Sequence, residues 1–203
     1  PPPAHSRTDR SRRPDIAPAG ANAFYIAKCR QFVNDPQDPR RVNQLWVNDG
    51  QGNYTEEAAE RGLVFFEQSW TADFADVDND GDFDCLVTNH SSTLLLLEND
   101  GTGNFNDITA GSGLEVTGFF LQAKLEDFDN DGYVDLVYSG GTHAYFRNNG
   151  DQTFTNIPNM FPYGDTMHSF ATGDVNRDGQ VDVYASYGNG YVSPDNGNDD
   201  VLW

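Results

Sequence analysis

Acidic side chains recur at fixed spacing in three short stretches of the chain. Residues 76–84 read DVDNDGDFD, residues 127–135 read DFDNDGYVD and residues 174–182 read DVNRDGQVD. Carboxylates packed this closely repel one another unless a cation lies between them. Oxygen ligands in a turn opened by glycine suit Ca²⁺, which takes about six to eight oxygens in flexible geometry. The alternative is a merely acidic, solvated turn, which three copies with glycine at the same offset disfavour.

The expected ligands are side-chain oxygens at positions 1, 3, 5 and 9 of each loop and the main-chain carbonyl at position 7. Together they are Asp76, Asp78, Asp80, Asp82, Asp84, Asp127, Asp129, Asp131, Tyr133, Asp135, Asp174, Asn176, Asp178, Gln180 and Asp182. This set predicts about three bound Ca²⁺ ions.

The residues around the loops exclude an EF-hand. An EF-hand needs a glutamate at position 12 and flanking helices, but position 12 is Val87, Tyr138 or Ala185. The residues after each loop are β-branched or aromatic, which is typical of strands. Each loop is therefore predicted to join two adjacent strands, and a dockerin-type arrangement is excluded for the same reason.

A second motif alternates with the acidic loops. Residues 45–54, 96–105 and 145–154 each place Asn-Asp-Gly or Asn-Asn-Gly between apolar runs, which is a strong hairpin signal because Asn and Gly tolerate positive φ. The first two copies lead into similar exit segments at 58–63 and 109–114. The unit is thus strand, acidic loop, strand, turn, strand, Asn-Asp-Gly turn and strand. Four strands in about 50 residues are typical of a β-propeller blade.

A degenerate copy precedes the three acidic loops. Residues 15–23 align with the loops without a gap, with Asp15 at position 1 and Gly20 at position 6. Alanine occupies positions 3, 5 and 9, the last being Ala23, so this loop is predicted to be empty of metal. The expected organisation is a Pro- and Arg-rich segment at 1–14, followed by blades at about 15–66, 67–117, 118–165 and 166–203.

The alternation of D-x-D-x-D-G-x-x-D with N-[DN]-G-x-x-x-F resembles the FG-GAP/VCBS-repeat propellers, the family of the integrin α-chain head. Within that family, residues 70–76 (WTADFAD) and 87–90 (VTNH) are similar to the secreted ASPIC/UnbV-type, cartilage acidic protein-like group. The resemblance covers about residues 15–203. It implies an all-β propeller with Ca²⁺ in hairpin loops on one rim, held by the aspartates and Asn176 named above.

The chain departs from the family in size. Such proteins usually build about seven blades, and this sequence holds about four, ending at 201–203 in the expected third strand of the last blade. It is therefore expected to be part of a larger propeller, or to be completed by another segment or subunit. The Arg-rich start is one candidate, since exposed sheet edges need a partner.

Charge and composition narrow the choice of partner. The 203 residues carry a formal charge of −20, concentrated after residue 41, which disfavours nucleic acid and anionic membranes. No apolar run approaches the roughly 20 residues of a membrane span. The chain starts at Pro1 rather than Met, so it is expected to have been processed or cut from something longer. An extracellular or cell-surface location is predicted.

The sequence contains two cysteines and two asparagines in potential glycosylation motifs. When the repeats are aligned, Cys29 lies five strand positions beyond the equivalent of Cys85, an offset of about 16 Å that is too long for a disulfide, so two unpaired or separately used cysteines are predicted. Asn53 and Asn89 lie in Asn-x-Ser/Thr sequons. They are possible glycosylation sites in a secreted protein.

The sequence contains none of the common catalytic signatures, including the nucleophile elbow, Walker A, HExxH and zinc spacings. The histidines are His5, His90, His143 and His168. His168, Asp73 and Lys124 fall on presumed inner strands, where they could line a central channel and bind a ligand, although packed or solvated roles are the simpler interpretation. Aromatic residues in the loops could bind sugar or protein, or simply pack between blades: Phe119, Phe120, Phe161, Tyr163 and Tyr191.

Three functions remain open. The favoured one is a calcium-stabilised extracellular module, without enzymatic activity, that binds protein or glycan through its loops or serves as a structural subunit of a surface assembly. An alternative is an enzyme domain, a hydrolase or lyase on polysaccharide, using His168, Asp73 and Lys124. A third is a self-associating fibre subunit, because incomplete propellers can add head to tail without closing.

Overall fold

The computed structural model describes residues 22–30, 33, 35, 38–161, 166–188 and 201–202. Residues 1–21 lie outside this set, and with them His5, the segment 1–14 and most of the degenerate loop; so do Tyr163 and Tyr191. Within the described residues the regular structure is entirely β. The strands are β1 (Ala23–Ile26), β2 (Gln44–Asn48), β3 (Tyr54–Glu56), β4 (Ser69–Ala75), β5 (Asp84–Thr93), β6 (Leu95–Asn99), β7 (Phe105–Asp107), β8 (Thr117–Glu126), β9 (Asp135–Gly140), β10 (Ala144–Asn148), β11 (Phe154–Ile157), β12 (Met167–Gly173), β13 (Asp182–Tyr187) and β14 (Val201–Leu202).

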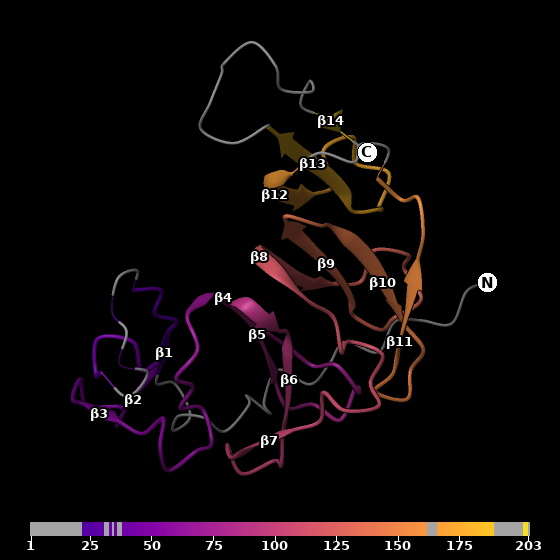
Figure 1. The fold of residues 1–203 in the computed structure, drawn as a ribbon. Helices are drawn as coiled ribbons and strands as arrows, with labels where there is room; N and C mark the ends of the chain where they lie inside the picture. Colours follow the sequence, from indigo (N-terminus) through magenta and orange to yellow (C-terminus); the bar gives the residue numbers. More distant parts are fainter. Residues whose placement is uncertain are drawn as a thin grey trace.

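The strands form antiparallel meanders that follow one another in an arc (Figure 1). Blade 2 is β4–β5–β6–β7 and blade 3 is β8–β9–β10–β11, each paired in chain order. Blade 1 contributes β1–β2–β3, and blade 4 contributes β12–β13–β14. This arrangement is that of a β-propeller, and it confirms the predicted fold class.

Burial follows from the stacking of the blades. All six residues of β9 are buried, because the sheets of neighbouring blades cover both of its faces. Its residues 136–138 (Leu-Val-Tyr) form a continuous apolar run instead of the alternation of a half-exposed strand. The predicted strand segments 85–88, 136–139 and 183–186 lie within β5, β9 and β13, as expected.

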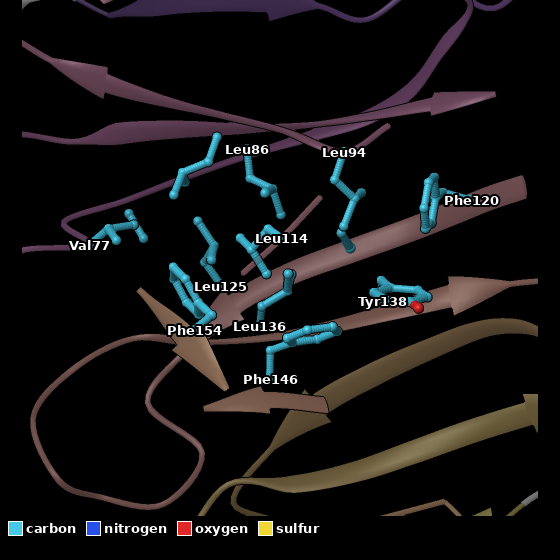
Figure 2. Close-up of a cluster of buried hydrophobic side chains, with 13 residues drawn as sticks. Val77, Leu86, Leu94, Leu114, Phe120, Leu125, Leu136, Tyr138, Phe146 and Phe154 are labelled. Atoms are coloured by element: carbon cyan, nitrogen blue, oxygen red, sulfur yellow. The ribbon is translucent and has the colours of Figure 1, made fainter. Parts of the chain in front are cut away.

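In the described part of the chain, three apolar clusters fill the spaces between blades. The largest joins blades 2 and 3, where Leu86 and Leu94 lie opposite Leu136 and Phe146 (Figure 2). A second cluster joins blades 1 and 2, and a third joins blades 3 and 4. A fully buried leucine contributes about 1.5–3 kcal/mol, so each interface is a substantial part of the stability of the fold.

Main-chain pairing also crosses from blade to blade. The first half of β5 pairs with β4 and β6, but its second half continues beyond the blade and pairs with the start of β8, with His90 opposite Phe119. In the same way the end of β9 meets the start of β12, where Gly140 pairs with Met167. The sequence did not predict this extension of β5.

Candidate metal centres

Each acidic loop connects the first and second strands of a blade, as predicted. Loop 1 (residues 76–84) joins β4 to β5, loop 2 (127–135) joins β8 to β9, and loop 3 (174–182) joins β12 to β13. Because equivalent strands sit at equivalent places in successive blades, all three loops lie at the same edge of the arc.

The backbone of each loop is held by its own acidic side chains in the same way. The position 1 carboxylate accepts a hydrogen bond from the N–H of the position 6 glycine, at 3.1, 3.0 and 2.9 Å in loops 1 to 3. The position 5 Oδ1 accepts from the N–H of position 7, at 2.8, 2.9 and 2.8 Å. These bonds hold each loop in a tight turn around its own carboxylates.

Local conformation explains the residue types at positions 4 and 6. The glycines at position 6 have φ of 103°, 96° and 88°, and the residues at position 4, Asn79, Asn130 and Arg177, have φ of 62°, 59° and 65°. Side chains disfavour this left-handed region, and asparagine tolerates it better than most. The backbone therefore wraps back on itself and directs its acidic side chains inward.

One oxygen in loop 1 lacks a partner within the described structure. Asp76 Oδ1 is buried and receives no hydrogen bond, which is costly for an acceptor away from water. Ligand oxygens of Asp76, Asp78 and Asp84 lie within 4.8 Å of one another, as do those of Asp127, Asp129 and Asp135. The donor set is entirely oxygen, and it fits a hard divalent cation such as Ca²⁺.

The electrostatics of these carboxyl groups favour a cation. Burial, aided by the neighbouring carboxylates, raises the pKa of Asp84 to about 7, against the main-chain hydrogen bonds that lower it. Burial likewise raises the pKa of Asp76 and of Asp135. A bound divalent ion would offset both the desolvation and the mutual repulsion of these groups.

The position 9 aspartate ties each of the first two loops to the third strand of its own blade. Asp84 accepts from the N–H of Val77 and of Asn99, each at 2.9 Å. Asp135 accepts from the N–H of Phe128 at 3.1 Å, from the N–H of Asn148 at 2.9 Å and from the hydroxyl of Tyr145 at 2.9 Å. The position 9 aspartate therefore stabilises the fold through its hydrogen bonds, in addition to its expected role as a metal ligand.

Loop 3 differs from the other two. Its position 3 is Asn176, an amide, so its trio of positions 1, 3 and 9 contains two carboxylates instead of three. Asn176 also donates a hydrogen bond to Asp178 Oδ2 at 3.0 Å. Residues 174–180 are exposed, and at position 2 the side chain of Val175 is 63% exposed where Val77 of loop 1 is fully buried.

The inner-strand candidates do not form a single constellation. Asp73 and Lys124 form an ion pair across blades 2 and 3, with Nζ 3.1 Å from Oδ2, and Asp73 also accepts from the N–H of Leu125 at 2.8 Å. His168 is not part of this pair; it is exposed on β12 of blade 4, with its ring near Gly188. The pairing of Asp73 supports a structural contact between blades.

The remaining candidate residues have varied surroundings. Asn53 is exposed, whereas the amide of Asn89 is buried and already donates to the carbonyl of Thr93 at 3.1 Å. Both cysteines are free, as predicted. Phe120 is buried, and Phe161 packs beside His143. Phe119 is 37% exposed, as is Trp70 at the same end of the inner strands, and His90 contacts both rings.

Sequence reasoning missed several residues that connect the loops to their neighbours. Asn79 and Asn130 donate from position 4 to the next loop, and Asn148 donates to the carbonyl of Val77 in loop 1. Gln152 donates to Asp78 Oδ2 at 2.8 Å and to Glu98 Oε1 at 2.6 Å. The repeated asparagine at position 4 is the one signal that could have pointed to such contacts.

Comparison with known proteins gives a consistent result. The model of the FG-GAP-like repeat matches residues 76–138 and 127–185, which together are more than half of the chain. Cartilage acidic protein 1 of Xenopus tropicalis is 26% identical over 175 residues, which cover 82% of this chain and 27% of that protein. The chain thus spans about a quarter of the length of this relative.

A solved structure of another protein is similar to part of this chain at low sequence identity. It is a lectin of Agrocybe aegerita, described for its specific recognition of non-reducing terminal N-acetylglucosamine. It is 18% identical, covers 78% of this chain and 46% of its own, and has a TM-score of 0.47.

Proposed function

The chain belongs to the FG-GAP-like repeat family, and on that premise we propose that its three acidic loops bind Ca²⁺ and stabilise an extracellular propeller module for ligand binding or adhesion. Sites of this kind in extracellular modules bind calcium with dissociation constants of roughly 10⁻⁴–10⁻³ M. The ions would complete the loops that join the first two strands of each blade.

The observation that carries this proposal is the buried oxygen of Asp76. Oδ1 has no hydrogen-bond partner in the described structure, although the other oxygen of the same carboxylate accepts from Gly81. Ligand oxygens of Asp78 and Asp84 converge on the same place. A cation bound there would satisfy the unpaired oxygen and neutralise much of the charge of the cluster.

Calorimetric titration of calcium into chelator-treated protein tests the metal assignment. We expect saturable binding and a rise in melting temperature, with a smaller rise in magnesium because Mg²⁺ demands stricter octahedral geometry. The control is Asp80→Asn with Asp131→Asn, which removes one charge from each of two loops. A melting curve that is the same in EDTA and in calcium would refute the assignment.

The binding surface we favour is the end of blades 2 and 3 opposite the metal loops. Trp70 and Phe119 lie near the starts of β4 and β8, and His90 lies between them with its ring 5.7 and 4.5 Å from theirs. Partly exposed aromatic rings offer apolar faces to a sugar or to a protein side chain.

Screening the chain against a glycan array and extracellular matrix proteins tests this surface. We expect Trp70→Ala to reduce binding, with Phe66→Ala, another exposed aromatic residue, as the matched control. Equal loss in both variants, or unchanged binding in Trp70→Ala, would rule out this surface.

Among the described residues, no helix has the length and apolar character that crossing a membrane requires.

A further inference from the structure

The metal loops of neighbouring blades are joined by a repeated hydrogen bond. Asn79, at position 4 of loop 1, donates from Nδ2 to the carbonyl of Gly132, at position 6 of loop 2, over 3.1 Å. Asn130, at position 4 of loop 2, donates to the carbonyl of Gly179, at position 6 of loop 3, also over 3.1 Å. The same atoms thus meet at two successive interfaces.

The hydrogen bond fixes a peptide group that leads to an expected ligand. The peptide between Gly132 and Tyr133 is held at its oxygen by Asn79 and at its N–H by Asp131 Oδ1, 2.9 Å away. The peptide between Gly179 and Gln180 is held in the same way. Holding both ends of this planar unit restricts the next carbonyl along the chain, which is the position 7 ligand.

The contacts run in one direction along the arc. In the degenerate loop, position 4 is Pro18, whose side chain has no donor. In loop 3, position 4 is Arg177. The two asparagine bonds run the same way along the arc: loop 1 donates to loop 2, and loop 2 donates to loop 3.

We propose that Asn79 and Asn130 are positioning residues that couple metal binding in adjacent loops, so that the loops bind cations with positive cooperativity. This inference rests on the proposed function. A cation held by positions 3 and 5 of one loop fixes the asparagine between them, and that asparagine fixes the peptide before the position 7 ligand of the next loop. By linkage, the coupling acts equally in both directions.

The expected size of the coupling follows from a single neutral hydrogen bond. Such a bond contributes enough to change an equilibrium constant by about two- to tenfold. Loss of Asn79 should therefore weaken binding in loop 2, which it does not belong to, by about that factor.

Terbium, a luminescent substitute for calcium, allows loop 2 to be observed separately. Tyr133 is position 7 of loop 2 and Tyr145 bonds to its position 9 aspartate, so both rings lie near the site and can sensitise emission. The signal lost in Tyr133→Phe/Tyr145→Phe is assigned to loop 2. The probe is terbium chloride titrated into the chelator-treated full chain.

The decisive variant is Asn79→Gly, because glycine accepts the positive φ of this position and removes only the side chain. We expect its loop 2 midpoint to rise by about two- to tenfold. In an Asp76→Asn background, where loop 1 is weakened, adding Asn79→Gly should have little further effect. This double-mutant cycle separates coupling through Asn79 from the general effect of removing a charge.

The control for ordinary blade packing is Gln122→Ala. Gln122 bonds both the N–H and the carbonyl of Phe170 in blade 4, at 3.1 and 3.0 Å, and lies outside the loops. It should lower the melting temperature without moving the terbium midpoint.

Three results would overturn the coupling: an unmoved midpoint in Asn79→Gly, an equal shift in both backgrounds, or the same shift in Gln122→Ala. Absence of sensitised emission and of calcium uptake in the unaltered chain would overturn the proposed function, and the coupling with it. That result is distinct from uptake without coupling.

Discussion

The side chain of Asn148 donates a hydrogen bond to the main-chain oxygen of Val77, 2.9 Å away and 71 positions earlier in the sequence. Asn148 begins the Asn-Asn-Gly turn of blade 3, and Val77 is position 2 of the metal loop in blade 2. A second bond from the same amide reaches the carbonyl of Val134 in loop 2 at 3.0 Å. One buried amide thus fastens two metal loops to one hairpin.

We expect Asn148→Ala to lower the free energy of unfolding by about 2–3 kcal/mol, because it leaves the buried carbonyl of Val77, the part-buried carbonyl of Val134 and the N–H of Gly150 without their partner. The matched control is Asn48→Ala, the equivalent turn residue in blade 1, whose Oδ1 accepts from Gly50. Urea denaturation measures both. Equal losses in the two variants would show that the turn alone, and not the link between blades, carries the effect.

Asp135 and Asp131 should separate stability from metal affinity. Asp135→Asn places an amide N–H₂ where three donors now converge. We therefore expect it to lower the free energy of unfolding by roughly 1–3 kcal/mol, and with it the melting temperature, even in EDTA. Asp131→Asn keeps its Oδ1 acceptor and is exposed, so its melt in EDTA should match that of the unaltered chain.

In calcium, both variants should gain less stability than the unaltered chain. Thermal melts with and without calcium read out all four conditions. If Asp135→Asn behaved like Asp131→Asn in EDTA, the hydrogen bonds of position 9 would not contribute to the metal-free fold.

Asn176→Asp should strengthen the third site. The change restores the carboxylate that loops 1 and 2 carry at position 3, and calcium affinity in such loops rises with the charge of the ligands. We expect the weakest calcium dissociation constant measured by titration to fall several-fold. As control, Arg177→Asn in the same loop alters charge without adding a ligand; a gain as large from that variant would assign the effect to net charge.

Two neighbouring glycines offer a test of close packing between blades 2 and 3. A Cβ on Gly113 would overlap the carbonyl oxygen of Phe154, whereas a Cβ on Gly111 would meet open space, and both residues have nearly the same positive φ. Gly113→Ala should therefore cost roughly 1–3 kcal/mol more than Gly111→Ala. Chemical denaturation gives the difference, and identical losses would mean that backbone strain alone explains both.

Much of the fold could be read from the sequence because its signals are local. A glycine at position 6, an asparagine before the hairpin and an apolar run after each loop act within a few residues of one another. They correctly predicted that each acidic loop joins β4 to β5, β8 to β9 or β12 to β13. The metal ligands themselves stay a prediction, supported by the convergence of the carboxylates of loops 1 and 2.

What could not be predicted involves residues far apart in sequence. Asn79 meets Gly132, and Gln152 meets Asp78, only because stacked blades bring them together. Gln152 also occupies a position where the other two turns have glycine, and it adopts φ of 63° there. Its side chain compensates by bridging two carboxylates, a role that local pattern does not reveal.

The continuation of β5 into the next blade has a mechanical consequence. A twist of blade 2 against blade 3 would have to break main-chain bonds between residues 90–93 and 117–119, in addition to sliding leucine side chains past one another. The main chain itself thus resists this twist, independently of which side chains lie at the rims. A ligand or neighbour that pulls on blade 2 would therefore load blade 3 directly through these main-chain bonds.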